Sequence, residues 1–151
     1  MLYIGADHKG FYLKEKIKEF LKTANIDFQD IGAFKYNKDD DYVDFASQVA
    51  KEVQKNPKQN KGIIICGTGI GNVIVANKFK NIRATQALTA LMAQRSREHN
   101  DANILSLAAD FTDPSIAWNI IKRFLKTSFI PKPNYIRRIK KIQKIEKNIK
   151  K

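Results

Sequence analysis

The sequence Ile63-Ile64-Ile65-Cys66-Gly67-Thr68-Gly69-Ile70-Gly71 decides the fold of this chain. Three β-branched residues lead into a cysteine, a pattern that predicts a buried parallel strand ending at a glycine-rich turn. The residues from Val73 to Lys78 favour a helix, so main-chain N–H groups of the turn are expected to face a bound anion. A thiol in this field should ionise more easily than a free one. We interpret the turn as a catalytic cradle, against the alternative that the cysteine is a small core residue.

The composition is that of a soluble globular protein. The chain has 151 residues, of which 43% are hydrophobic and 28% are charged. We expect a single domain over residues 1–151. The N-terminal sequence lacks the pattern of a signal peptide, and no segment approaches the roughly 20 apolar residues of a membrane span. The one cysteine cannot form an internal disulfide, which favours a reducing cytoplasmic location without membrane contact.

Most of the positive charge lies in the last residues. Residues 132–151 hold nine Lys or Arg and one acid, Glu146, so they carry +8 of the net charge of +13. Residues 134–151 are expected to form a basic helix with an apolar stripe, which consists of Ile136, Ile139, Ile142, Ile145 and Ile149. We favour a solvated helix face over a surface that contacts nucleic acid.

Strand and helix patterns alternate five times, and this predicts a doubly wound, Rossmann-like α/β fold. The expected strands are Leu2–Gly5, Asp27–Ile31, Ile63–Cys66, Arg83–Leu88 and Asn103–Leu107. Five parallel strands favour the flavodoxin-like order 2-1-3-4-5, with the ligand at the switch point between strands 1 and 3. Asp7 and His8, which follow the first strand, should therefore share a crevice with Cys66 and the residues after it. One amphipathic helix should end before Asn56-Pro57, and another should begin at Asp113-Pro114.

The apolar stripe of the C-terminal helix has no face of the sheet left to cover. A partner subunit is the simplest way to bury it, and a homodimer with twofold symmetry is the commonest arrangement. The choice between a dimer and a tetramer stays open.

Several further motifs accompany the glycine turn. They are Gly5-Ala6-Asp7-His8, Asp41-Tyr42, Ala76-Asn77-Lys78, Ile82-Arg83-Ala84 and Arg97-Glu98-His99-Asn100-Asp101-Ala102-Asn103. Over nearly the whole chain the sequence resembles the type B ribose-5-phosphate isomerase family, which also includes galactose-6-phosphate isomerase subunits. The resemblance implies a Rossmann-like sheet and a dimer with active sites at the subunit interface. It also implies an aldose–ketose isomerisation through a cis-enediolate that needs no metal or redox cofactor.

The resemblance also implies roles for individual residues. Cys66 would be the base that shuttles a proton, Thr68 would assist proton transfer, and His99 would open the sugar ring. The enediolate oxygen would be held by main-chain N–H groups of the turn. The substrate-binding positions are Asp7, His8, Tyr42, Gly67, Gly69, Gly71, Asn100, Arg137 and Arg138.

Three of these residues also have structural readings. Asp7 could cap the first helix, Asn100 could be a turn residue, and Tyr42 could be a half-buried aromatic at a helix start. The sequence leaves both readings of each open.

The chain departs from the family at the phosphate end. Asp110 stands where the family usually has arginine, and Lys132-Pro133-Asn134-Tyr135 stands where it usually has Gly-Gly-Arg-His. Loss of cations weakens a phosphate site, since charge-assisted hydrogen bonds contribute about 1.5–3 kcal/mol each. Ribose 5-phosphate is the expected substrate, and allose 6-phosphate or galactose 6-phosphate is the alternative. A more remote alternative to an isomerase is a protein that binds a polyanion through the basic C-terminal helix.

Overall fold

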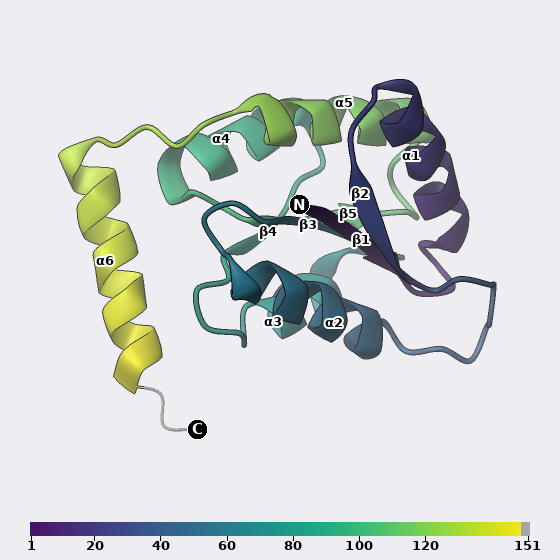
Figure 1. Cartoon of the computed structure of the whole chain (residues 1–151), viewed down its shortest axis with the longest axis horizontal. Coiled ribbons are helices and arrows are strands. Elements are labelled where there is room, and N and C mark those ends of the chain that lie inside the picture. Colours follow the sequence, from purple (N-terminus) through teal and green to yellow (C-terminus); the bar gives the residue numbers. More distant parts are fainter. Residues whose placement is uncertain (149–151) are drawn as a thin grey trace.

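The computed structural model describes residues 1–148, in which strands and helices alternate as far as α5 (Figure 1). The strands are β1 (Leu2–Ala6), β2 (Phe28–Gly32), β3 (Lys61–Cys66), β4 (Ala84–Gln86) and β5 (Ile104–Ala108). The helices are α1 (Phe11–Thr23), α2 (Tyr42–Lys55), α3 (Ile70–Ala76), α4 (Ala90–Asn100), α5 (Pro114–Lys126) and α6 (Pro133–Asn148). The predicted α/β class is confirmed, as is the start of a helix at Pro114.

The five strands form one parallel sheet in the order β2-β1-β3-β5-β4. The predicted order 2-1-3-4-5 was wrong for the last two strands. Every residue of β5 is buried, whereas β4 has only three residues and all of them are half-buried. A fully buried apolar strand belongs inside a parallel sheet and a short one at its edge, which explains the exchange.

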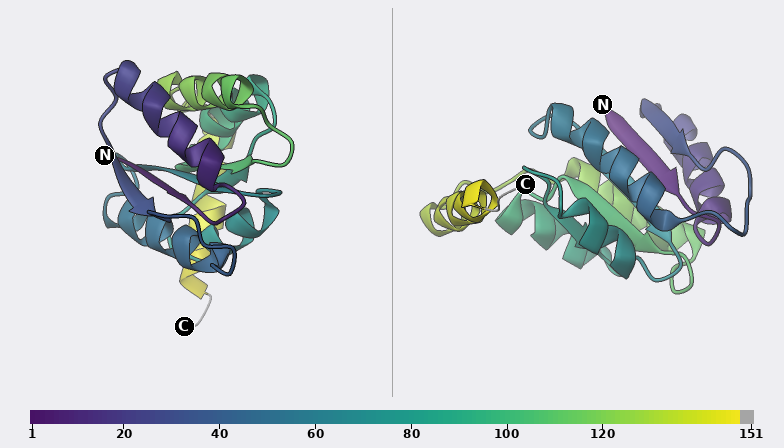
Figure 2. Two further views of the ribbon diagram at one scale, coloured as in Figure 1. Left: turned by 90° about the vertical axis from the view of Figure 1, so that its right-hand side faces the viewer. Right: turned by 90° about the horizontal axis from the view of Figure 1, so that it is seen from below.

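Helices cover both faces of the sheet (Figures 1 and 2). On one face, α1, α4 and α5 pack through Ile17, Ala93 and Phe124 against strand residues that include Ile63 and Leu105. On the other face, α2 and α3 pack against the alternate strand positions, which include Ile64 and Ile104. Because successive strand residues point to opposite faces, the run Ile63-Ile64-Ile65 contributes to both halves of the core.

Several predicted boundaries differ from the structure. Helix α3 begins at Ile70, directly after the glycine turn, rather than at Val73. Strand β4 is shorter than the predicted Arg83–Leu88. Helix α4 continues to Asn100, so His99 and Asn100 lie in its last turn, and Asn100 ends a helix.

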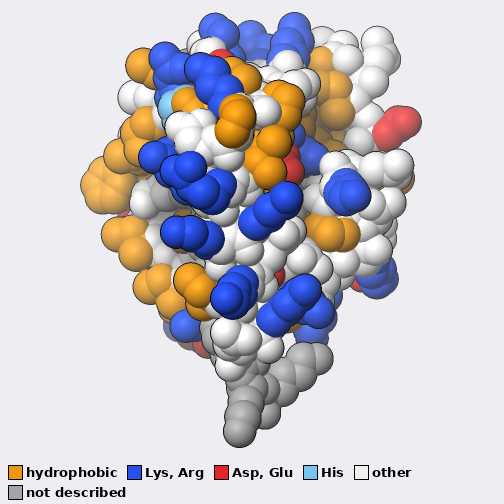
Figure 3. All heavy atoms as spheres, turned by 90° about the vertical axis from the view of Figure 1, so that its left-hand side faces the viewer, with side chains coloured by type: hydrophobic (Ala, Val, Ile, Leu, Met, Phe, Trp, Pro, Cys, Tyr) orange, Lys and Arg blue, Asp and Glu red, His pale blue; other side chains and the backbone are white. Residues whose placement is uncertain are grey.

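Helix α6 stands apart from the two helical layers, beyond the end of α4 (Figures 1 and 2). It has no buried residue, and Ile142 and Ile145 of its predicted stripe are exposed. Ile149 lies outside the described residues. Lysine and arginine side chains alternate with hydrophobic ones on this end of the molecule (Figure 3). Within residues 1–148, no helix combines the length and the apolarity that crossing a membrane requires.

Candidate active site

The loops after β1 and β3 lie side by side at the carboxyl edge of the sheet, as the switch-point rule predicts. These two strands are hydrogen-bonded neighbours, with Ala6 opposite Ile65. The Asp7 N–H continues the ladder by donating to the Ile65 carbonyl at 3.3 Å. The structure therefore brings Asp7 and His8 next to the turn that begins at Cys66.

Cys66 is the last residue of β3, and its side chain is buried. The Gly69 N–H donates to the Cys66 Sγ at 3.2 Å. Burial raises the pKa of the Cys66 thiol, and the Asp7 carboxylate raises it further, whereas the N–H groups of Gly69, Asn72 and Thr68 lower it. Our expectation of a lowered pKa was wrong, because it counted the favourable N–H groups and not the loss of water around the thiolate. The Gly69 N–H is also directed at sulfur, not at open space for a substrate.

The turn itself has a conformation that depends on glycine. Gly69, the residue before α3, has φ +76°, and a Cβ there would lie 3.2 Å from the Leu107 carbonyl oxygen. The exposed Thr68 precedes it, and the Thr68 Oγ1 accepts from the Ile70 N–H at 3.4 Å. Thr68 thus places its hydroxyl two residues from the thiol of Cys66, on the solvent side of the turn.

Asp7 is buried, and its Oδ1 accepts a hydrogen bond from the Gly10 N–H at 2.9 Å. Gly10 is the residue before α1, so the carboxylate closes the turn that starts this helix. Burial raises the pKa of Asp7, although the Gly10 N–H opposes that rise. Asp7 therefore has a structural role at the start of α1. It also lies close enough to Cys66 for its negative charge to raise the pKa of the thiol.

His8 is held by Asp40 from the loop between β2 and α2. One carboxylate oxygen, Oδ1, lies 2.8 Å from both the His8 main-chain nitrogen and the His8 Nδ1. The other oxygen, Oδ2, is buried and has no hydrogen-bond partner within residues 1–148. The hydrogen bond with Asp40 raises the pKa of His8, and the Asp7 carboxylate adds to the rise. The pair favours a protonated imidazole, which would attract an anion.

Two further side chains border the turn. Tyr42, the first residue of α2, lies against Gly71, where an added Cβ would be 2.6 Å from its ring. The Asp110 carboxylate lies against Gly67, where an added Cβ would be 2.7 Å from Oδ2. Asp110 therefore points at the turn, where a negative charge would repel a phosphate.

The remaining predicted residues lie elsewhere. His99 and Asn100 end α4, and the following Asn103 carbonyl accepts from Gly62, at the start of β3. Cys66 is at the other end of this six-residue strand, about 13–16 Å away at 3.3 Å per residue. The structure of one chain therefore separates His99 and Asn100 from the residues around Cys66.

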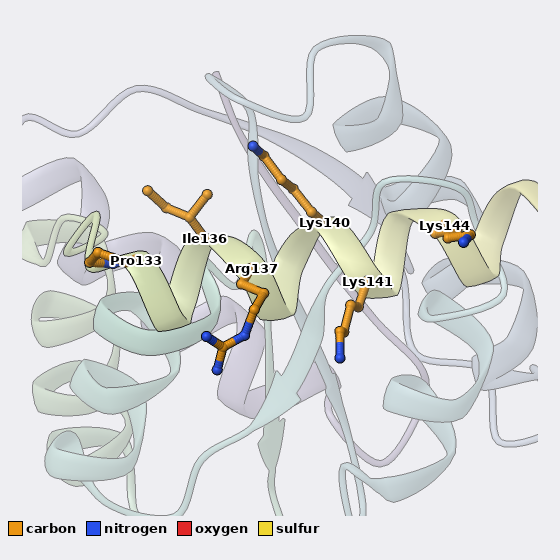
Figure 4. A pocket seen from close by; sticks show the side chains of 6 residues that line it. All are labelled: Pro133, Ile136, Arg137, Lys140, Lys141 and Lys144. Atoms are coloured by element: carbon orange, nitrogen blue, oxygen red, sulfur yellow. The ribbon is translucent and has the colours of Figure 1, made fainter.

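Arg137 and Arg138 lie on α6, at the same end of the molecule as His99. The His99 ring packs on the Tyr135 ring with 4.7 Å between centroids. A groove along α6 is lined by Pro133, Ile136, Arg137, Lys140, Lys141 and Lys144 (Figure 4). Arg137 and Lys141 project from the same side of the helix there, so two cations of α6 lie next to each other.

Sequence reasoning missed three polar residues that touch this site: Asp40, Gln86 and Ser106. Asp40 belongs to the acidic run Asp39-Asp40-Asp41, in which nothing distinguishes it from its neighbours. Ser106 is the one polar residue in the buried strand β5, and this was a signal that its hydroxyl needs a partner.

Comparisons with known proteins agree on one family. Residues 2–142 match the family described as Ribose/Galactose Isomerase. A probable ribose-5-phosphate isomerase B of Mycoplasma genitalium is 40% identical over 146 residues, which is 97% of this chain and 95% of the relative. A galactose-6-phosphate isomerase subunit of Streptococcus pyogenes is 38% identical over 128 residues, 85% of this chain and 87% of the relative.

Solved structures have the same fold. Ribose-5-phosphate isomerase B from Mycoplasma genitalium, solved with bound ribulose 5-phosphate, superposes with a TM-score of 0.93 at 39% identity, over 97% of this chain and 96% of the other. The enzyme of the same name from Clostridium thermocellum gives a TM-score of 0.92 at 40% identity, over 99% of both chains.

Proposed function

The chain belongs to the ribose/galactose isomerase family, and we propose that it interconverts ribose 5-phosphate and ribulose 5-phosphate through a cis-enediolate. The observation that carries the proposal is the position of Cys66, a buried thiol at the switch point that receives the Gly69 N–H. The similar Mycoplasma genitalium structure holds ribulose 5-phosphate, which supports this choice of substrate.

Cys66 is the base in this proposal. As the thiolate it removes the proton from carbon 2 of the open-chain aldose, and it returns a proton to carbon 1 of the enediolate. The raised pKa means that less thiolate is present at neutral pH, but the thiolate that forms is a stronger base. Thr68, whose hydroxyl lies on the solvent side of the turn, moves a proton at the sugar oxygen.

The enediolate oxygen needs hydrogen-bond donors where its charge develops. We assign this role to main-chain N–H groups of the turn between Gly67 and Gly71, with Asn100 of a second subunit. Asp7 and Tyr42 are assigned to the sugar hydroxyls, since both border the turn.

The proposed site takes residues from two copies of the chain. His99, which would open the ring, lies at the opposite end of β3 from Cys66, and one subunit cannot bring them together by side-chain motion. A homodimer that places α4 and α6 of one subunit over the turn of the other would supply His99 and the arginines. The phosphate would then lie between His8 and Arg137 and Arg138 of the partner subunit.

The reaction moves hydrogen within one molecule and changes no net oxidation state, so we propose that it proceeds without a metal or redox cofactor. Turnover should persist after dialysis against a chelator. A loss of activity that added divalent cations restore would contradict metal independence.

A six-carbon sugar phosphate is the second candidate, favoured by the galactose-6-phosphate isomerase relative. The test compares kcat/KM for ribose 5-phosphate, allose 6-phosphate and galactose 6-phosphate on the purified protein. The proposal requires ribose 5-phosphate to have the highest value. A higher value for either hexose phosphate would transfer the function to that substrate.

A further inference from the structure

Two side chains, one from β4 and one from β5, donate hydrogen bonds to main-chain carbonyl oxygens of the glycine turn. Gln86, the last residue of β4, donates from Nε2 to the Thr68 carbonyl oxygen at 2.5 Å. Ser106, in the middle of β5, donates from Oγ to the Gly69 carbonyl oxygen at 2.8 Å, and it is fully buried. Neither residue belongs to the set assigned to the reaction above.

Each contact fixes one planar peptide unit. The Thr68 carbonyl belongs to the same peptide as the Gly69 N–H, and in a trans peptide the two groups point in opposite directions. Gln86 holds the carbonyl end, and the N–H end is directed at the Cys66 Sγ at 3.2 Å. The chain of contacts runs from Gln86 through the peptide to the thiol.

The next peptide unit repeats the arrangement. Ser106 holds the Gly69 carbonyl, and the N–H at the other end of that peptide, from Ile70, donates to the Thr68 Oγ1 at 3.4 Å. Hydrogen bonds in such chains polarise one another, so a donor at the carbonyl strengthens the N–H at the opposite end.

We propose that Gln86 and Ser106 are positioning residues for proton transfer, Gln86 acting on Cys66 and Ser106 acting on Thr68, each through one peptide of the turn. The inference rests on the proposed isomerase function for its kinetic consequences. The two hydrogen bonds that connect Gln86 with the Cys66 thiol through the peptide do not depend on that function. The close fit at Gly69 agrees, because a Cβ there would lie 3.1 Å from the Gln86 Nε2.

The first test is Gln86→Met, which keeps the length of the side chain and removes the donor. Cys66 is the only cysteine, so the pH dependence of alkylation by iodoacetamide reports its ionisation directly. We expect the alkylation profile to move to higher pH and kcat on ribose 5-phosphate to fall about tenfold, since an indirect contact matters less than a direct anion-hole donor. KM should change little, because a contact that acts on proton transfer lowers kcat and kcat/KM about equally.

Gln54→Met is the matched control. Gln54, near the end of α2, also donates from Nε2 to a main-chain carbonyl, that of Lys80 at 2.8 Å, but it lies away from the turn. This variant should keep the wild-type alkylation profile and kcat. If Gln86→Met keeps the wild-type alkylation profile, the assignment of Gln86 is overturned.

Ser106→Ala tests the second peptide. It should lower kcat several-fold, about the size expected for a lost positioning contact, while the Cys66 alkylation profile stays near that of the wild type. Ser96→Ala is its control, because Ser96 is a second buried serine, with Oγ donating to the Ala93 carbonyl within α4 at 2.7 Å. An unchanged kcat in a folded Ser106→Ala protein, or equal losses in both serine variants, would overturn the assignment of Ser106.

The two measurements separate the inference from the proposed function. A wild-type protein inactive on ribose 5-phosphate contradicts the function, while a shifted thiol profile in Gln86→Met alone still supports the contact. An active wild-type protein with an unshifted profile in Gln86→Met contradicts the inference and leaves the function standing.

Discussion

Asp40 is the neighbour that most strongly favours a protonated His8. The Asp40 Oδ1 accepts from both the His8 main-chain N–H and the His8 ring, so the imidazole cannot turn away without breaking the pair. The two carboxylates that face His8 are Asp40 and Asp7, and both favour its protonated form. With Asp110 in place of the arginine expected at that position, the proposed phosphate site would depend more strongly on a charged His8.

Asp40→Asn should lower the pKa of His8, because the amide accepts a hydrogen bond but carries no charge. NMR titration of the two histidine rings measures this, with His99→Gln identifying the signals. KM for ribose 5-phosphate near pH 7.5 should rise, as fewer molecules carry a protonated His8. Asp39→Asn, an exposed change in the same loop, is the control.

The free energy of unfolding should also depend on the pair of His8 and Asp40. The pKa of His8 is raised in the folded state, so its contribution to the free energy of unfolding is complete below the unfolded value of about 6.5 and is lost as pH rises through the folded value. Asp40→Asn should therefore destabilise the protein more at pH 5.5 than at pH 9. Equal destabilisation at both values, with an unshifted His8 titration, would contradict the account of this pair.

The sequence predicted the carboxyl-edge part of the candidate site better than its electrostatics. The apolar run into Cys66 placed the thiol at the switch point, since local pattern and strand topology determine that position. The direction of its pKa shift depends on burial by helices distant in sequence, and no local pattern reports that. Asp40 was missed for the same reason, because its partner His8 is 32 residues away.

At the scale of elements, Lys14 ties α1 to the end of β2. Its side chain has no exposed surface, and its Nζ donates to both Asp30 oxygens at 2.8 and 2.9 Å and to the Ala33 carbonyl at 2.7 Å. Lys18 also pairs with Asp30, at 2.6 Å. The segment that follows Ala33 leads to Asp40, so this ion pair anchors the loop that holds His8.

Lys14→Met should lower the free energy of unfolding by about 3 kcal/mol, the lower end for breaking a buried ion pair, because Lys18 still neutralises Asp30. Denaturant unfolding measures the change. Lys16→Met, on the exposed face of α1 with a surface pair to Glu19, should change it by less than about 1 kcal/mol. A loss in Lys14→Met no larger than in Lys16→Met would contradict an anchoring role for the buried lysine.

The order of the sheet could be predicted only in part. The buried run of β3 and the helix between β1 and β2 placed β2, β1 and β3 correctly. The positions of β4 and β5 depend on which of the two strands the helices bury, and that is a property of the folded chain. The three residues of β4 suit an edge, but the predicted strand Arg83–Leu88 was longer, so its length did not argue against the default order for five strands.

At the scale of the whole molecule, the proposed residues form two groups at opposite ends of one chain. Cys66 and His8 lie at the carboxyl edge of the sheet, while His99, Arg137 and Arg138 lie with α4 and α6. Sequence alone could not predict this division, because it follows from where α4 ends and α6 lies relative to the sheet (Figure 1). The proposed homodimer is the arrangement that would reunite the groups, and Ile142 and Ile145 are exposed on α6 as an interface would require.

Mixed subunits test this arrangement. Cys66→Ala and His99→Ala homodimers should each be strongly impaired, since each lacks one component in both sites. Unfolding and refolding the two variants together should restore about a quarter of wild-type activity, because about half of the randomly formed dimers are hybrids with one intact site of two. Refolded wild-type protein is the control for yield. No recovery in a mixture that forms hybrid dimers would place the whole site within one subunit.

The central claim is that the Cys66 thiolate transfers the proton between carbons 1 and 2 of ribose 5-phosphate. The most direct measurement is hydrogen exchange by NMR in D2O, with wild-type protein and Cys66→Ala compared at equal concentration. A thiol exchanges its proton with solvent, so the wild-type protein should introduce deuterium at carbon 2 of ribose 5-phosphate and at carbon 1 of ribulose 5-phosphate as the sugars interconvert. Cys66→Ala should bind the sugar and introduce none. Deuterium incorporation by folded Cys66→Ala at the wild-type rate would contradict the account.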